Sequence, residues 1–178
     1  MSTVFRPVPV PAGLPAFASM GALLLAMDAH DMEPPLAERV RIDGRWLRRK
    51  HEFHLTVLGS EAGLRVRALL GEEALQAALA ELDWSVERSG RYELLGKLKP
   101  TATGTTACYS VIEHVRAPGM VDLYAVLAAR IPDLPPCPPP HVTHYILGDP
   151  DGIGVPSRAA LEAYRIRPVR AGELAGIR

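Results

Sequence analysis

The chain has 178 residues, of which 48% are apolar and 22% are charged. This composition is that of a globular domain, and a chain of this length can bury roughly 70% of its unfolded surface. The 20 basic and 20 acidic residues balance to a net charge of zero. This balance excludes a general attraction to polyanions, so any contact with RNA has to be local.

The predicted elements alternate between strands and helices. The Ala16–Met27 run predicts an N-terminal helix, and Asp43-Gly44 between apolar stretches predicts a two-residue β-hairpin. Apolar residues at helical spacing predict a helix over Glu72–Trp84, with glutamates in its first turn, where the helix dipole favours them. The other expected elements are a strand around His54, strands over Tyr92–Lys99 and Ala107–Val115, a helix over Met120–Ile131, a strand beginning near His141, a helix over Arg158–Ala163 and a strand over Tyr164–Val169.

No shift in composition marks a linker between separate cores, so we expect one domain over residues 1–178. Residues 1–35 form a variable N-terminal segment that begins with several prolines. A second group of prolines, within residues 132–140, cannot form a helix and is stiff and extended. We expect this second group to hold the chain extended and stiff directly before the strand that begins near His141.

The cysteines and the N-terminal region favour a cytoplasmic protein without a membrane anchor. Cys108 and Cys137 are too few for a disulfide framework, and we interpret them as a core residue and a loop residue. The longest aliphatic run near the N-terminus, residues 21–27, is far shorter than the roughly 20 residues of a membrane-spanning helix. It could instead be the core of a signal peptide, but only Arg6 supplies positive charge before it.

One short pattern occurs twice, as His54-Leu55-Thr56 and as His141-Val142-Thr143, each within an apolar and β-branched stretch. Side chains alternate between the two faces of a strand, so the histidine and threonine of each triplet point to the same side. Each triplet therefore presents an imidazole and a hydroxyl together, and the middle residue turns to the opposite face.

Two such histidines suit acid/base chemistry at phosphorus. Histidine titrates near neutral pH, so one imidazole can hold a proton while the other accepts one. We predict His54 and His141 as the catalytic pair, with Thr56 and Thr143 hydrogen-bonding the nonbridging phosphate oxygens. This scheme requires no metal and no cofactor.

The spacing of His51 with His54 and of His141 with His144 leaves a metal-dependent hydrolase open as an alternative. Positions three apart on a strand face opposite sides, however, so each pair is separated by its sheet. We therefore interpret His51 and His144 as partly buried structural histidines. A noncatalytic module that binds RNA or a nucleotide in the same cleft is the other alternative.

The two His-x-Thr triplets and their surroundings, Phe53 to Gly59 and Pro140 to Thr143, resemble the two-histidine (2H) phosphoesterase superfamily. That family includes bacterial 2′,3′-cyclic phosphodiesterases and the so-called 2′-5′ RNA ligases. The resemblance implies an α/β (α+β) fold of two pseudo-twofold lobes, with two small, mostly antiparallel sheets lining a central cleft and helices outside. It implies catalysis by His54 and His141, phosphate binding by Thr56 and Thr143, and a nucleotide or RNA-end substrate. We expect the protein to be a monomer.

Other residues have both a functional and a structural interpretation. Tyr145 has the parity of His141 and Thr143, so it either contacts the substrate or packs. Lys97 and Lys99 share a strand face and either approach an anion or form an exposed edge. The Gly148–Gly154 loop is best explained by consecutive turns. A cluster of six cations either contacts RNA or forms a solvated hairpin face; it comprises Arg39, Arg41, Arg45, Arg48, Arg49 and Lys50.

Overall fold

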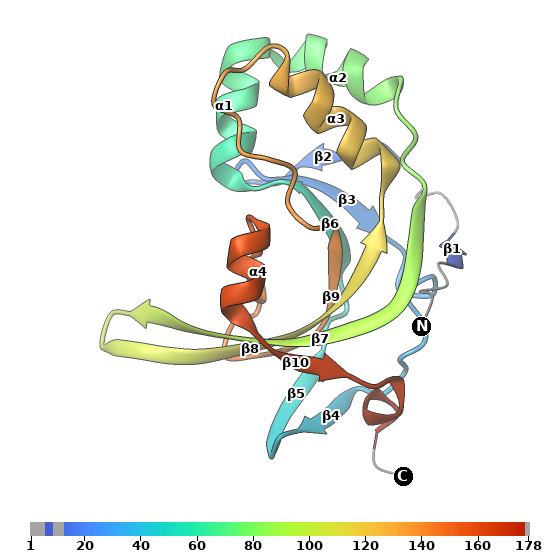
Figure 1. The fold of residues 1–178 in the computed structure, drawn as a ribbon, viewed down its shortest axis with the longest axis vertical. Coiled ribbons are helices and arrows are strands. Elements are labelled where there is room, and N and C mark those ends of the chain that lie inside the picture. The colour runs from blue at the N-terminus through green and yellow to red at the C-terminus, as the bar shows by residue number, and fades with distance from the viewer. Residues whose placement is uncertain (1–5, 9–12, 177–178) are drawn as a thin grey trace.

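We describe the fold from a computed structural model, for residues 6–8 and 13–176. Helices and antiparallel strands make up an α+β structure, as expected (Figure 1). Part of the proline-rich N-terminal stretch, including Pro9 and Pro11, lies outside the described residues. The strands are β1 (Arg6–Val8), β2 (Ala16–Phe17), β3 (Leu23–Met27), β4 (Arg39–Ile42), β5 (Arg45–Arg49), β6 (Phe53–Leu58), β7 (Val86–Thr101), β8 (Gly104–Arg116), β9 (His141–Leu147) and β10 (Arg165–Val169).

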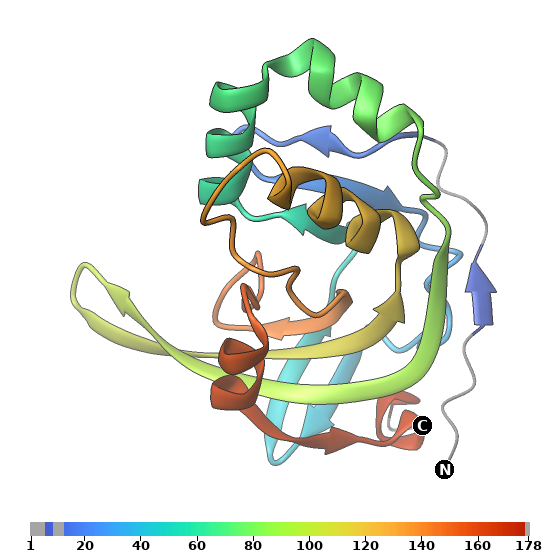
Figure 2. The ribbon, with the colours of Figure 1, turned by 45° about the horizontal axis from the view of Figure 1, so that its top comes forward.

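Four α-helices and one 3-10 helix complete the described part of the chain. Helices α1, α2 and α3 gather on one side of β6, and α4 lies on the other side of the β6–β9 region (Figures 1 and 2). None of these helices is long and apolar enough to cross a membrane. Their bounds are α1 (Ser60–Leu70), α2 (Glu72–Ala80), α3 (Pro118–Ala128), α4 (Arg158–Tyr164) and η1 (Ala171–Leu174).

The described strands hydrogen-bond into one ten-stranded sheet, with the main order β1-β7-β8-β9-β6-β3-β2. The expectation of two separate small sheets is therefore wrong. The reason is the central strand β9, which pairs with β8 along one edge and with both β6 and β5 along the other. The two triplet-bearing strands are immediate neighbours in this sheet, and the long β7–β8 hairpin extends beyond the body of the molecule (Figure 2).

The N-terminal helix predicted over residues 16–27 is also wrong, because this segment forms the β2–β3 hairpin. Gly21 has a φ of +85°, in the left-handed region that a helix interior does not use. After it, β3 alternates in burial, with Leu23, Leu25 and Met27 buried. β3 pairs with β6 along its whole length, so the apolar run that resembles a helix face instead extends the sheet.

The other elements follow the sequence more closely. Asp43 and Gly44 have φ values of 50° and 79°, as a tight hairpin turn requires, and they join β4 to β5. The predicted helices over 72–84 and 120–131 correspond to α2 and α3, each shorter at its C-terminus. Helix α1 was not expected. It packs closely on the β2–β3 turn: a Cβ atom added to Gly63 would lie only 2.0 Å from the Gly21 carbonyl oxygen, so this approach requires glycine at position 63.

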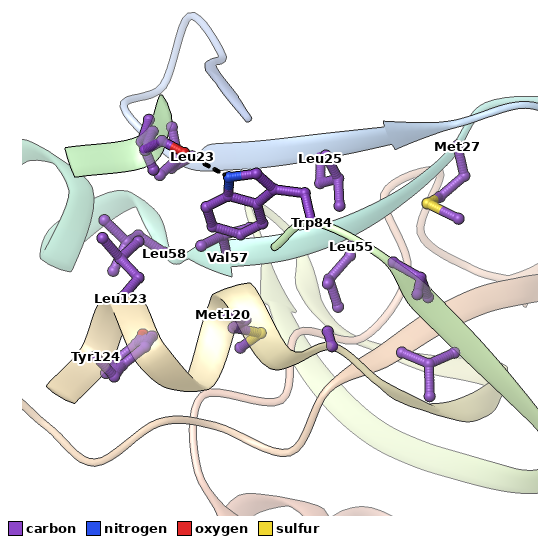
Figure 3. Close-up of a cluster of buried hydrophobic side chains, with 14 of the residues drawn as sticks. Leu23, Leu25, Met27, Leu55, Val57, Leu58, Trp84, Met120, Leu123 and Tyr124 are labelled. Atoms are coloured by element: carbon purple, nitrogen blue, oxygen red, sulfur yellow. Dashed lines mark hydrogen bonds between the residues drawn. The ribbon is translucent and has the colours of Figure 1, made fainter. Parts of the chain in front are cut away.

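The largest hydrophobic core lies between the helices and the β3–β6 side of the sheet (Figure 3). Trp84 packs against β3 and β6, and its indole nitrogen donates a hydrogen bond of 2.8 Å to the Leu79 carbonyl. Met120 and Leu123 of α3 pack into the same cluster, and Tyr124 lies at its edge. Cys108 is buried in a second cluster, as expected for a core residue, and Cys137 lies in the loop before β9. These contacts fix α1 and α3 above the two triplet-bearing strands.

Candidate active site

The two triplets lie side by side in the sheet. Leu55 of β6 and Val142 of β9 are antiparallel partners, and both are buried in the core, at 1% and 0% exposure. The histidines and threonines on either side are only half-buried. The predicted alternation is thus confirmed, with the middle residues turned into the core and the four polar side chains turned to the other face.

The register places each histidine opposite the threonine of the other triplet. With Leu55 facing Val142, His54 falls opposite Thr143 and Thr56 falls opposite His141. The two histidines are then diagonal neighbours, whose separation in an antiparallel pair is about 7–8 Å between backbones. A group of the size of a phosphate can lie between two imidazoles placed in this way.

All four polar side chains line one pocket of about 520 Å³. A volume of this order is typical of small-molecule sites, which range over about 300–1,000 Å³. The floor is formed by β6 and β9, and the walls come from α1, α3, the β7 strand, the 148–156 loop and the proline-rich segment before β9. The wall residues are Gly59, Ser60, Glu61, Ala62, Arg65, Lys97, Lys99, Tyr124, Leu134, Pro135, Pro136, Pro138, Asp151, Ile153, Gly154, Val155 and Pro156.

His141 is held in one orientation by the backbone. Its Nδ1 lies 2.8 Å from the carbonyl oxygen of Pro139, and a carbonyl can only accept, so Nδ1 carries the hydrogen. The nitrogen that remains to gain or lose a proton is Nε2. Burial lowers the pKa of His141; the Pro139 carbonyl raises it, and the neighbouring imidazoles of His114 and His54 lower it.

His54 has a different electrostatic environment. Burial lowers its pKa, and the nearby ammonium group of Lys50 lowers it further. The carboxylates of Asp151 and Glu52 act in the opposite direction and favour the imidazolium. Both triplet histidines therefore have pKa values below that of an ordinary histidine, and an anionic ligand between them would favour protonation.

A row of polar side chains continues from His141 across the neighbouring strands. His114 on β8 is the cross-strand partner of His141, and its Nε2 lies 3.1 Å from a carboxylate oxygen of Glu93. Arg165 binds the same carboxylate through two contacts of 3.1 Å. Sequence analysis missed this row, because it joins β7, β8, β9 and β10 and has no local pattern.

Lys97 and Lys99 lie in the pocket wall, so the structure places both near a bound ligand. Lys99 forms an ion pair with Asp149 and donates a hydrogen bond of 3.1 Å to the Gly152 carbonyl. Lys97 lies 4.7 Å from the centre of the Tyr164 ring. The turns expected over residues 148–154 do form, and the same loop also contributes to the pocket.

Tyr145 does not line the pocket, and of its two interpretations the structure favours packing. It is completely buried, and its hydroxyl donates a hydrogen bond of 2.8 Å to the Ala37 carbonyl. The reason is a register shift between β8 and β9: Ile112 pairs with Thr143, but Val111 pairs with Tyr145. Such an irregularity interrupts the alternation of faces, and Tyr145 turns into the core with Val111.

His51 and His144, the other histidines of the two H-x-x-H spacings, do not line the pocket. His51 is exposed at 73% of its side chain, beside Glu38, so its expected partial burial is wrong. It precedes β6 and therefore lacks the cover of the sheet. His144 is completely buried, beyond the partial burial expected, and its Nε2 lies 2.9 Å from a Glu113 carboxylate oxygen. Within residues 6–8 and 13–176, no three or more His, Cys, Asp or Glu side chains are grouped as metal ligands.

No family model matches this chain, and neither a curated protein nor a solved structure matches it. The interpretation of the pocket therefore depends on its own geometry and chemistry.

The cationic cluster forms the β4–β5 hairpin and the residue after it, outside the pocket. Its strands bury Val40, Ile42 and Leu47 on one face, so most of the arginines project into solvent. Arg49 is the exception, because it is buried and its guanidinium group lies 5.5 Å from the centre of the Phe53 ring. A solvated hairpin face accounts for the cluster, and contact with RNA stays a prediction.

Proposed function

We propose that the protein is a phosphoesterase of the two-histidine type. Its substrate is a cyclic phosphate or a 2′-5′ phosphodiester of a nucleotide or RNA end, and it acts without a metal ion. The observation that carries the proposal is the meeting of His54, Thr56, His141 and Thr143 in one pocket, on adjacent strands paired at Leu55 and Val142. The family relationship, its pseudo-twofold lobes and a cytoplasmic location belong to the same proposal.

The chemistry follows from the diagonal arrangement. The phosphate lies between the imidazoles, and the Thr56 and Thr143 hydroxyls donate hydrogen bonds to its nonbridging oxygens. One neutral imidazole removes a proton from water as the water oxygen bonds to phosphorus. The other, as imidazolium, gives its proton to the ribose oxygen as the ring P–O bond breaks. The product is a phosphate monoester, and exchange with solvent restores the two protonation states.

The proposal is tested by incubating the purified protein with the four nucleoside 2′,3′-cyclic phosphates and a 2′-5′-linked dinucleotide, in the presence of a chelator. We expect ring opening to a single nucleoside monophosphate isomer, measured by liquid chromatography and ³¹P NMR. Saturable binding without turnover of any of these compounds would instead favour the noncatalytic binding module. Turnover that is abolished by the chelator and restored by a divalent metal would favour a metal-dependent hydrolase.

We expect Thr56→Val and Thr143→Val to weaken substrate binding and transition-state stabilisation without unfolding the protein. Each change removes one hydroxyl that is half-buried in the pocket and retains the shape of the side chain. A hydrogen bond to a charged group contributes about 1.5–3 kcal/mol, so kcat/KM should fall by about 10- to 150-fold. Steady-state kinetics measures the fall; Thr106→Val on the β8 side of the long hairpin is the control and should retain wild-type kinetics.

The pH dependence of kcat/KM should peak below pH 6.5. Activity requires one neutral and one protonated imidazole, so it declines above the higher pKa, where the acid is lost, and below the lower pKa, where the base is lost. Burial lowers the pKa of His54 and of His141 from the usual 6.5. Both limbs of the bell are thereby displaced to lower pH, and kcat/KM measured from pH 4.5 to 8.5 should show this displacement.

His114→Gln tests one smaller contribution to this displacement, that of a neighbouring imidazole. The substitution removes a neighbouring imidazole whose positive charge lowers the pKa of His141, so one limb should move to higher pH. His30→Gln, at an exposed position, should leave the profile unchanged. A maximum at or above pH 7 for the wild type would contradict the proposed use of two histidines with lowered pKa values.

A further inference from the structure

The imidazole of His141 owes its orientation to one backbone group, the Pro139 carbonyl, which accepts a hydrogen bond of 2.8 Å from Nδ1. That carbonyl belongs to the strap, which we define as residues 132–140 before β9. The strap contains no helix or strand, and none of its residues is fully buried. Leu134 and Cys137 pack only partly against the main core. The shape of the strap therefore depends on a few particular contacts more than on burial.

The strap begins at a turn with an unusual backbone. Asp133 has a φ of 64°, in the left-handed region that residues with a Cβ atom rarely adopt. Aspartate tolerates this region better than most residues do, but an unsupported chain would spend most of its time elsewhere. The turn at Asp133 therefore needs a contact that holds it in this conformation.

Arg65 of α1 supplies that contact. Its Nη2 donates a hydrogen bond of 2.8 Å to the Pro132 carbonyl, and its Nη1 donates one of 3.3 Å to the Asp133 carbonyl. These carbonyls belong to the two peptide planes on either side of the Asp133 Cα atom, so holding both of them fixes the φ and ψ of this residue. A guanidinium suits this task, because its donors lie in one rigid plane.

Prolines carry this fixed geometry along the strap to the histidine. They are Pro132, Pro135, Pro136, Pro138, Pro139 and Pro140. Each has its φ locked at about −65° and also restricts the residue before it. At the far end, the Val115 amide donates a hydrogen bond of 3.1 Å to the Pro140 carbonyl. The Pro139 carbonyl thus lies within a stiff span that is anchored by Arg65 at one end and by β8 at the other.

We propose that Arg65 is a positioning residue: by holding the turn at Asp133 it sets the strap, and the strap keeps the His141 imidazole in its Nδ1–H form. Nε2 is then the nitrogen that exchanges a proton with the substrate. The catalytic consequence rests on the proposed phosphoesterase function, whereas the effect on the imidazole does not. The alternative is a direct contact with the substrate, because Arg65 also lines the pocket.

The test measures the tautomer of His141 directly, by ¹H–¹⁵N NMR of the full chain labelled with ¹⁵N-histidine. Spectra are recorded at pH 8, where His141 is neutral because burial lowers its pKa, and its signals are identified by their absence from His141→Ala. In the wild type we expect the hydrogen on Nδ1. Arg65→Ala removes both hydrogen bonds that hold the turn, so about one third or more of the population should move to the Nε2–H form.

Asp133 offers a matched pair of substitutions outside the pocket. Asp133→Val introduces a β-branched residue that strongly disfavours a positive φ, and it should reproduce the effect of Arg65→Ala. Asp133→Gly adopts the left-handed region freely and should keep the Nδ1–H form. Both remove the same carboxylate, so the difference between them reports the backbone alone. Arg67→Ala, on the same helix, removes contacts with Phe17 and Glu72 and should match the wild type in NMR and in kinetics.

With a nucleoside 2′,3′-cyclic phosphate as substrate, kcat should fall by about 5- to 50-fold in Arg65→Ala and Asp133→Val, with KM changed by less than about 2-fold. A wild-type His141 spectrum in either of these variants would overturn the positioning role. A higher KM for Arg65→Ala together with that spectrum would assign Arg65 to direct substrate contact instead. If no cyclic phosphate is turned over, the phosphoesterase function is overturned, and the NMR comparison still decides whether Arg65 positions His141.

Discussion

Replacing His54 or His141 with alanine is expected to lower kcat for a 2′,3′-cyclic nucleotide by about 10²–10⁴-fold, the usual contribution of a positioned acid or base. Each imidazole lines the pocket floor, and His54 and His141 are the histidines among the described residues that line this pocket. Because the two act in one proton-transfer cycle, the double variant should lose little more activity than either single variant.

His51→Ala is the matched control for this experiment. His51 lies three residues from His54 in the sequence but outside the pocket, and its side chain is largely exposed. It should retain wild-type kcat and KM, and all variants should unfold at similar urea concentrations. Wild-type turnover by either His54→Ala or His141→Ala would exclude the two-histidine mechanism, whatever the substrate.

Strand periodicity was enough to predict from the sequence which side chains of the two triplets share a face. The rule that alternate residues share a face placed His54 with Thr56 and His141 with Thr143, and the structure confirms both pairs. The same rule failed for Tyr145, because the register shift beside Thr143 interrupts the alternation. A single sequence contains no mark of such an irregularity, since it depends on how two strands are paired.

The rest of the pocket depends on long-range packing. Tyr124 falls within a predicted helix whose spacing indicates a core face. Its position in the pocket, beside the proline-rich residues 132–140, follows only from how α3 packs in the core. The β2–β3 segment shows the converse, because its short apolar run has no period that separates a buried strand from a helix. Pairing with β6 decided its conformation.

The face of the sheet opposite the pocket contains a charged group that the sequence did not indicate. Glu113 of β8, the cross-strand partner of Val142, is completely buried. Its carboxylate accepts hydrogen bonds from Arg88, at 2.7 and 3.0 Å, from the Gly90 amide, at 2.8 Å, and lies 2.9 Å from His144. Arg88 also donates to backbone carbonyls of residues 31–34. One carboxylate therefore joins the triplet-bearing strand, the neighbouring hairpin and the segment before β4.

Glu113→Ala is expected to lower the free energy of unfolding by about 3–5 kcal/mol, because it leaves the buried Arg88 guanidinium without its counter-charge. This is a large part of the about 5–15 kcal/mol that stabilises a typical domain. Urea denaturation followed by circular dichroism measures the change.

The matched control is Glu87→Ala, which removes a carboxylate paired with Arg116 across the same two strands. The Arg116 side chain is 59% exposed, and an exposed ion pair contributes about 0–1 kcal/mol. The two substitutions therefore differ in the burial of the cation that is left behind and in the Gly90 and His144 contacts that only Glu113 makes. If Glu113→Ala cost no more than Glu87→Ala, the buried group would not hold the sheet together, and the orientation of β9 behind the reactive histidines would have to come from the hydrophobic core alone.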